Sequence, residues 1–154
     1  MDFTFQVLNN TRAIFGKIID TNSLEKLNKI PYGFNNNIIW NIGHVVVTGQ
    51  LLAYKLSGLQ PMVSDEMINK YKKDSRPEGA VTQDEVNDIK TLLFSTFEKT
   101  KEDYNNGAFK NYNAYTVSTT GNTLNNIDDA LQFILLHEGI HYGYILALSK
   151  ALKN

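Results

Sequence analysis

The stretch IDDALQFILLHEGIHYGYILALSKAL, residues 127–152, decides the fold of this chain. Apolar residues recur in it at intervals of three and four, which is the period of an amphipathic α-helix. His137 and His141 lie four residues apart on this helix, so both imidazoles can reach one point beside it. The other residues on that face are almost all apolar, which predicts that the two histidines face the protein interior.

Three other segments repeat apolar residues at the same helical spacing. They run from about Thr4 to Ile19, from Ile38 to Ser57–Gly58, and from a capping box at Thr82–Glu85 to about Tyr104. We expect one further short helix around Asp65–Lys72. No segment alternates apolar and polar residues over a length that would favour a sheet, so the sequence predicts an all-α fold.

Two long connections separate these helices, Gln60–Val81 and Asn105–Asn125. Four helices joined by links of this length are typical of a four-helix bundle in which at least one connection crosses over. Because the sequence contains no internal repeat and no segment with the composition of a linker, we expect a single domain over residues 1–154.

The composition excludes several classes of protein. Charged residues make up 20% of the chain and the net charge is -1, which argues against a basic nucleic-acid-binding face. The uncharged segment Ile38–Tyr54 is too short and too polar for a membrane span. The first residues do not have the pattern of a secretory signal. We therefore expect a cytoplasmic protein with no nucleic-acid or membrane partner.

The absence of cysteine leaves the three histidines as the natural candidates for a soft-metal site. His44 lies in the middle of the second predicted helix, on a largely apolar side, where it can face His137 and His141. Three neutral imidazoles form a set of ligands for Zn²⁺ or a similar divalent ion and leave one position open. The alternative interpretation is that each histidine is a hydrogen-bonded core residue and no metal binds.

His137-Glu138-Gly139-Ile140-His141 also matches the H-E-x-x-H motif of zinc peptidases, in which the glutamate is the general base. Those enzymes take a third ligand from downstream, but no His, Asp or Glu follows His141 in this chain. A peptidase would need His44 as its third ligand from upstream, so the sequence disfavours this function. We expect Glu138 to be a surface carboxylate or one that supports a ligand.

Other residues near the histidines are candidates for lining the site. Trp40 and Tyr144 each lie one helical turn from a histidine, and Asn41 shares the side of its helix that carries His44. Gly139 and Gly143 lie one turn apart on the opposite side of the last helix. Small residues at this spacing allow another helix to approach closely, either within the bundle or across a homodimer.

Two stretches of the sequence together resemble the DinB-like superfamily. NIIWNIGH, residues 37–44, follows PYGF at residues 31–34 and is similar to the family's second-helix signature, in which a tryptophan precedes the first histidine ligand by one turn. LHEGIHYG, residues 136–143, resembles the last-helix H-x-x-x-H of the family. The resemblance implies an up-down-down-up four-helix bundle, a divalent metal held by His44, His137 and His141, and frequent homodimerisation.

The resemblance also bears on activity. Some members of the family are S-transferases that use bacillithiol, mycothiol or glutathione, and others are described as metal-dependent hydrolases. We therefore expect a metal-dependent enzyme that acts on a small molecule, either a thiol-dependent S-transferase or a hydrolase, with Zn²⁺ or Ni²⁺ as the first choice of metal and Mn²⁺ or Fe²⁺ as alternatives. The other hypothesis is a non-catalytic, metal-stabilised bundle that acts as a binding or stress-response module.

Overall fold

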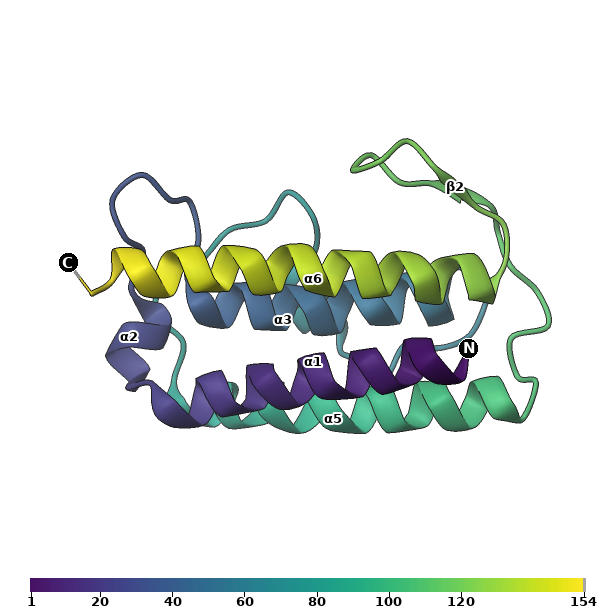
Figure 1. Cartoon of the computed structure of the whole chain (residues 1–154), viewed down its shortest axis with the longest axis horizontal. Helices are drawn as coiled ribbons and strands as arrows, with labels where there is room; N and C mark the ends of the chain where they lie inside the picture. Colours follow the sequence, from purple (N-terminus) through teal and green to yellow (C-terminus); the bar gives the residue numbers. More distant parts are fainter. Residues whose placement is uncertain (154) are drawn as a thin grey trace.

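The computed structural model describes residues 1–153 and is predominantly helical (Figure 1). In chain order the helices are α1 (Asp2–Thr21), α2 (Leu24–Asn28), α3 (Ile38–Gln50), the π-helical segment η1 (Leu51–Lys55), α4 (Asp65–Tyr71), α5 (Gln83–Asn105) and α6 (Ile127–Ala151). The two strands are β1 (Tyr115–Thr116) and β2 (Thr123–Leu124), which pair antiparallel. The all-α class predicted from the sequence is confirmed.

The four long helices, α1, α3, α5 and α6, lie side by side in Figure 1. Helix α6 packs on α1 and α3, and α5 packs on the same two helices. Helices α1 and α6 begin at one end of the molecule, whereas α3 and α5 begin at the other. This arrangement places the middle of α6 next to the middle of α3, and these are the helices that carry the three histidines.

Side-chain caps fix several helix starts. Asn37, Thr82 and Asn126 each accept a hydrogen bond from the backbone N–H three residues further on, which satisfies one of the free donors at a helix N-terminus. The predicted start of α5 after Thr82 is confirmed. The reciprocal half of the capping box is not formed, because the Glu85 carboxylate accepts a hydrogen bond from the Tyr71 hydroxyl at 2.5 Å instead.

Three features of the chain differ from the expectations. The short helix α2 follows α1 where no helix was predicted. The second long helix changes from α to π geometry at Leu51, with the N–H of Leu56 donating to the carbonyl of Leu51 five residues back at 3.2 Å. The hairpin of β1 and β2 occupies the connection after α5, where no strand was expected.

Gly139 and Gly143 do not pack against another helix of this chain. Both are exposed, and no heavy atom of residues 1–153 lies within 4 Å of a Cβ built at either position. Of the two alternatives left open by the sequence, close packing within the bundle is therefore excluded, because the face of α6 that carries them points to solvent.

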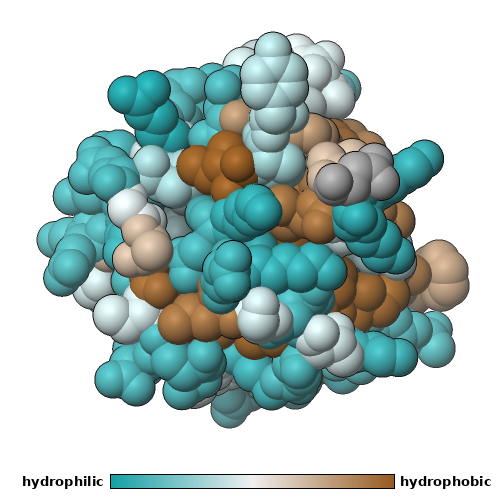
Figure 2. Space-filling model, turned by 90° about the vertical axis from the view of Figure 1, so that its left-hand side faces the viewer, coloured by the Kyte–Doolittle hydropathy of each residue, from teal (hydrophilic) through white to brown (hydrophobic). Residues whose placement is uncertain are grey.

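The surface is mostly hydrophilic at the end of the molecule that faces the viewer in Figure 2, with hydrophobic side chains exposed between the polar ones. In the part of the chain that the structure describes, none of the helices has the length and apolar character needed to cross a membrane.

Candidate metal centre

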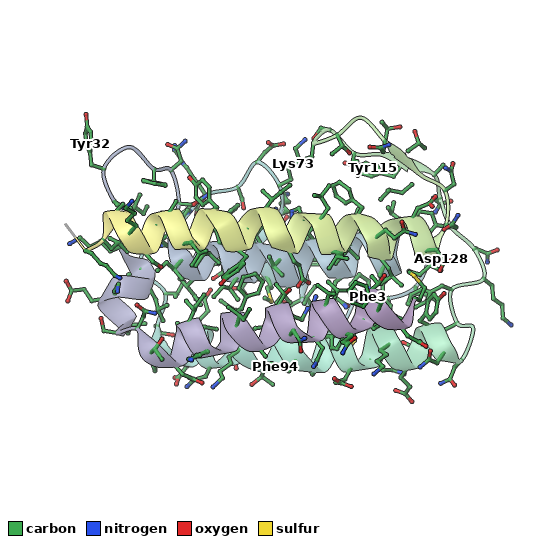
Figure 3. The ribbon with its side chains drawn as sticks, in the orientation of Figure 1. Phe3, Tyr32, Lys73, Phe94, Tyr115 and Asp128 are labelled. Carbon is green, nitrogen blue, oxygen red and sulfur yellow. The ribbon has the colours of Figure 1, made fainter. Side chains whose placement is uncertain are left out.

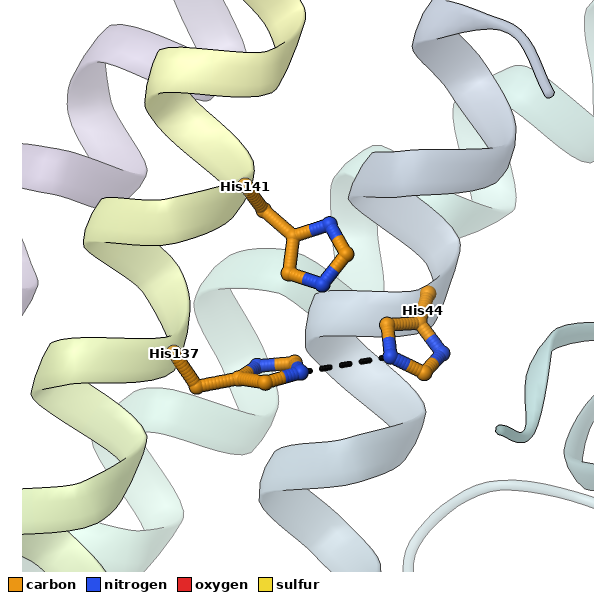
Figure 4. A group of neighbouring side chains, drawn as sticks. All are labelled: His44, His137 and His141. Atoms are coloured by element: carbon orange, nitrogen blue, oxygen red, sulfur yellow. Dashed lines mark hydrogen bonds between the residues drawn. The ribbon is translucent and has the colours of Figure 1, made fainter. Parts of the chain in front are cut away.

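The three histidines meet between α3 and α6 (Figure 4). One ring nitrogen from each of His44, His137 and His141 can be chosen so that all three lie within 4.8 Å of one another. The Nε2 atoms of His44 and His137 are 3.2 Å apart, although these residues are 93 positions apart in sequence. The fold therefore brings together the three residues that the sequence singled out.

The orientation of His44 is fixed by the end of α4. Its Nδ1–H donates to the backbone carbonyl of Tyr71 at 2.6 Å, since a carbonyl oxygen can only accept. This carbonyl belongs to the last turn of α4, where the carbonyl groups lack partners within the helix. With the proton on Nδ1, the Nε2 lone pair of His44 faces the other two histidines.

Two neighbours on α3 help to place the Tyr71 carbonyl and the His44 ring. Gly43 lets the ring of Tyr71 lie directly on α3, because a Cβ at this position would be 2.6 Å from Tyr71 Cδ1. Trp40 stacks on the imidazole of His44 with ring centroids 4.9 Å apart and an interplanar angle of 10°. Its Nε1–H donates to the carbonyl of Lys70 at 3.3 Å, so Trp40 also holds the end of α4.

His141 is oriented in the same way by Asn41. The Nδ1 of His141 lies 2.8 Å from Asn41 Oδ1. The amide nitrogen of Asn41 donates to Asn36 Oδ1 at 2.9 Å and to the Asn37 carbonyl at 2.7 Å, which identifies the other amide atom as the accepting oxygen. His141 therefore carries its proton on Nδ1, and its Nε2 lone pair is free to bind a ligand. Such a hydrogen bond to the remote nitrogen is typical of metal-binding histidines.

The histidines are held in their neutral form by their surroundings. Burial lowers the pKa of His137 to about 3, with smaller contributions from His141 and His44. Burial and the proximity of His44 lower the pKa of His141 to about 4. Burial also lowers the pKa of His44, against the opposing effect of its hydrogen bond to the Tyr71 carbonyl. A neutral imidazole is the form that binds a metal.

The donor set fits a divalent transition metal. Two nitrogens that bind one tetrahedral Zn²⁺ are roughly 3.3 Å apart, from Zn–N bonds of about 2.05 Å. The Nε2 atoms of His44 and His137 are separated by 3.2 Å, close to that value. Imidazole suits Zn²⁺, Ni²⁺ and Fe²⁺ more than Mg²⁺ or Ca²⁺.

A cavity of about 440 Å³ opens beside the histidines, within the range of roughly 300–1,000 Å³ that small-molecule sites occupy. All three histidines line it. The remaining lining residues come from the end of α3, the segment η1, the connection after α4, the hairpin and α6. A group bound at the histidines would therefore be reachable by a small molecule.

The three residues expected to line the site have different surroundings. Trp40 and Asn41 are buried and do not line the cavity; Trp40 stacks on His44, and Asn41 accepts a hydrogen bond from His141. The ring of Tyr144 packs edge to face on Phe34 with centroids 5.5 Å apart, and Tyr144 is not among the residues that line the cavity.

Other important residues were missed by the sequence analysis. Tyr71 acts through its backbone carbonyl, which no side-chain pattern reveals. Thr48 lies one turn after His44, and its hydroxyl is 3.3 Å from His44 Nε2. The spacing of Thr48 and Lys55 from His44 on one helix could have identified both as neighbours of the site.

Glu138 is buried and faces away from the cavity. Its Oε1 accepts hydrogen bonds from Arg12 Nη2 at 2.8 Å and Arg12 Nε at 3.0 Å, and its side chain has an exposed fraction of 0%. The expectation of a surface carboxylate is wrong, because the Arg12 guanidinium on α1 holds Glu138 in the interior. Burial raises the pKa of Glu138, and Arg12 opposes this effect.

Comparison with known proteins identifies the family. Among curated proteins, no match to this chain was found. The sequence model of one protein family, the DinB superfamily, matches residues 7–145. The match covers most of the chain and includes His44, His137 and His141. On this evidence the chain belongs to the DinB superfamily.

Proposed function

We propose that this protein is a divalent-metal-dependent enzyme that acts on a small molecule, with His44, His137 and His141 as the metal ligands. The observation that carries the proposal is the convergence of these three histidines on the wall of a cavity of about 440 Å³. A metal that served only to join helices would not need a cavity of this kind, so the cavity favours an enzyme over a non-catalytic binding module.

The chain's own residues would hold and orient the ligands. The Tyr71 carbonyl and the Asn41 amide oxygen fix the proton of His44 and His141 on Nδ1, which leaves Nε2 available to the metal. Trp40 covers one face of His44 and excludes water from it. Zn²⁺ and Ni²⁺ are the metals that we favour, with Mn²⁺ and Fe²⁺ as alternatives.

A divalent ion at this site would supply Lewis-acid activation of a nucleophile, either a low-molecular-weight thiol or water. With a thiol the protein would be an S-transferase, and with water it would be a hydrolase. Because the chain has no cysteine, it offers no thiolate of its own to compete with a thiol substrate.

We also propose that the four long helices form the up-down-down-up bundle expected of the family. The directions of α1 and α6, opposite to those of α3 and α5, support this topology, as do the long connections before and after α5.

We further propose that the protein is a homodimer whose contact lies on the exposed face of α6. Leu136, Ile140 and Leu146 have exposed fractions of 47%, 45% and 50%, which is high for large apolar side chains. The exposed Gly139 and Gly143 between them leave room for the close approach of a second helix.

The enzymatic proposal is tested by assaying protein reconstituted with Zn²⁺, Ni²⁺ or Mn²⁺ against a panel of thiols with electrophiles and a panel of hydrolase substrates. We expect activity that disappears when the metal is removed and in the variant His137→Ala. Glu138→Gln is the matched control, because this adjacent residue faces Arg12 and should leave metal content unchanged. Activity that survives both metal removal and His137→Ala would contradict the proposal.

A further inference from the structure

One wall of the cavity is a single face of α3 and η1. His44, Thr48, Leu51 and Lys55 follow one another on it at intervals of three and four residues, and all of them line the cavity. The π-helical turns begin at Leu51, and such turns are often found where a helix forms part of a functional site. This face leads from the histidines, past apolar side chains, to the amine of Lys55.

The remaining walls are mainly apolar. Val117 of the hairpin and Phe133 of α6 are both buried and line the cavity. Leu52 and Ile140 also contribute to the lining. These side chains favour the aliphatic or aromatic part of a ligand over a fully hydrated one.

The charged groups of the cavity are all positive. Lys55 and Lys73 line it, and the lining residues include no Asp or Glu. Neither lysine forms an ion pair with a carboxylate within residues 1–153. Lys73 donates to Ser118 Oγ at 2.8 Å, which joins the connection after α4 to the hairpin over the cavity. Figure 3 shows Lys73 and Tyr115, another lining residue, on the same side of α6.

We propose that the cavity binds a small anion with an apolar body, whose negative group pairs with Lys55 and Lys73. This inference rests on the proposed function in one respect, namely that the cavity is the substrate site of the metal centre. The apolar walls bind the body of the ligand, and the lysines select for its charge, because an unpaired ammonium group near a partly enclosed cavity attracts an anion.

The test compares two fluorescent probes that share an apolar body and differ in charge. The anionic probe is 1-anilinonaphthalene-8-sulfonate, and the neutral probe is N-phenyl-1-naphthylamine. We expect the wild type to bind the anionic probe more tightly. Lys55→Met and Lys73→Met should each weaken its binding about two- to fivefold, the effect of losing one partly exposed ion pair, and leave the neutral probe unaffected.

Lys72→Met is the matched control. Lys72 is exposed and adjacent to Lys73, but its amine donates to Asn69 Oδ1 and it does not line the cavity. Leu51→Trp, at a partly buried lining position outside the proposed dimer contact, should weaken both probes by filling the cavity. Equal affinity of the wild type for the two probes would overturn the inference, and so would unchanged binding of the anionic probe in the double variant of Lys55 and Lys73.

The titrations are run on zinc-loaded protein and on protein treated with a chelator, because a bound cation would itself attract an anion. The inference is supported if both the zinc-loaded and the chelator-treated protein prefer the anionic probe, and if this preference depends on Lys55 and Lys73. If the protein binds no metal but keeps its preference for the anionic probe, the proposed function fails, and the assignment of the cavity as an anion-binding site stands without the metal centre. If the protein binds metal and shows no effect of the lysines, the inference alone fails.

Discussion

Asn41 is fully buried next to His141, with an exposed fraction of 0%. It is not one of the three proposed ligands and acts through His141. Its amide oxygen accepts from His141 Nδ1 at 2.8 Å, while its amide nitrogen is held by Asn36 and Asn37. This single side chain therefore decides which nitrogen of His141 is available as a ligand, and it links the start of α3 to the middle of α6.

Replacing Asn41 should weaken metal binding without removing a ligand. We expect Asn41→Leu to lower the affinity for Zn²⁺ about 10- to 100-fold, the usual effect of losing a hydrogen bond to a metal-binding histidine. Asn41→Asp keeps an accepting oxygen and should retain more of the affinity. Competition with a chromophoric chelator measures both variants. Equal affinities for Asn41→Leu and the wild type would show that Asn41 has no such role.

At the scale of single residues, the sequence predicted the members of the candidate site but not their support. His44, His137 and His141 could be found because they are the chain's only histidines and two of them have helical spacing. The Tyr71 carbonyl could not be found, since every residue has a carbonyl and only the packing of α4 on α3 selects this one.

At the scale of helices, the pair of Arg12 and Glu138 connects α1 to α6 in the interior. Arg12 also donates to the Leu93 carbonyl at 2.7 Å and to Thr96 Oγ1 at 3.2 Å, so it joins α5 to the same network. Its side chain is 6% exposed and that of Glu138 is 0% exposed. A buried charge that loses its partner is costly, because the remaining charge is no longer compensated.

We expect Arg12→Met to lower the free energy of unfolding by about 3–5 kcal/mol. The double variant of Arg12→Met and Glu138→Leu should recover much of this loss, because it removes both charges. Lys90→Met, which breaks an exposed pair with Asp20, is the control and should cost less than about 1 kcal/mol. Urea denaturation followed by circular dichroism measures all three. A double variant as unstable as Arg12→Met would argue against the electrostatic explanation.

The helices differ in how far the sequence could predict them. The start of α5 follows from a local signal, the Thr82 cap, and was predicted correctly. The change to π geometry at Leu51 was not predicted, because the spacing of residues along the cavity face fits an α-helix equally well. Whether Gly139 packs within the bundle could not be decided from the sequence, since a helical pattern cannot tell which neighbour, if any, covers a face.

At the scale of the whole molecule, a metal at the three histidines would join helices that are distant in sequence. At a free Zn²⁺ concentration 100 times the dissociation constant, the folded state gains about 2.7 kcal/mol. This should raise the melting temperature of a chain of this size by roughly 5–10 °C. Differential scanning calorimetry of His137→Ala should show no such shift, and an equal shift in this variant would contradict the ligand assignment.

The proposed dimer is also a property of the whole molecule. Leu146→Lys places a charge on the exposed face of α6 and should convert the dimer to a monomer in sedimentation velocity experiments. Ile14→Lys is the control, because Ile14 is an exposed apolar residue of α1 with an exposed fraction of 38%. A wild type that sediments as a monomer at high concentration would exclude this dimer.

Trp40 is an intrinsic fluorescent probe of the proposed metal site. It is the only tryptophan of the chain, it is 7% exposed, and its ring lies 4.9 Å from that of His44. The tryptophan fluorescence of the protein therefore comes from one position, next to the proposed ligand His44. Ni²⁺, which has a partly filled d shell, should quench this emission on binding, whereas Zn²⁺ with its filled d shell should change it little. The unlabelled protein can thus report which kind of metal has bound.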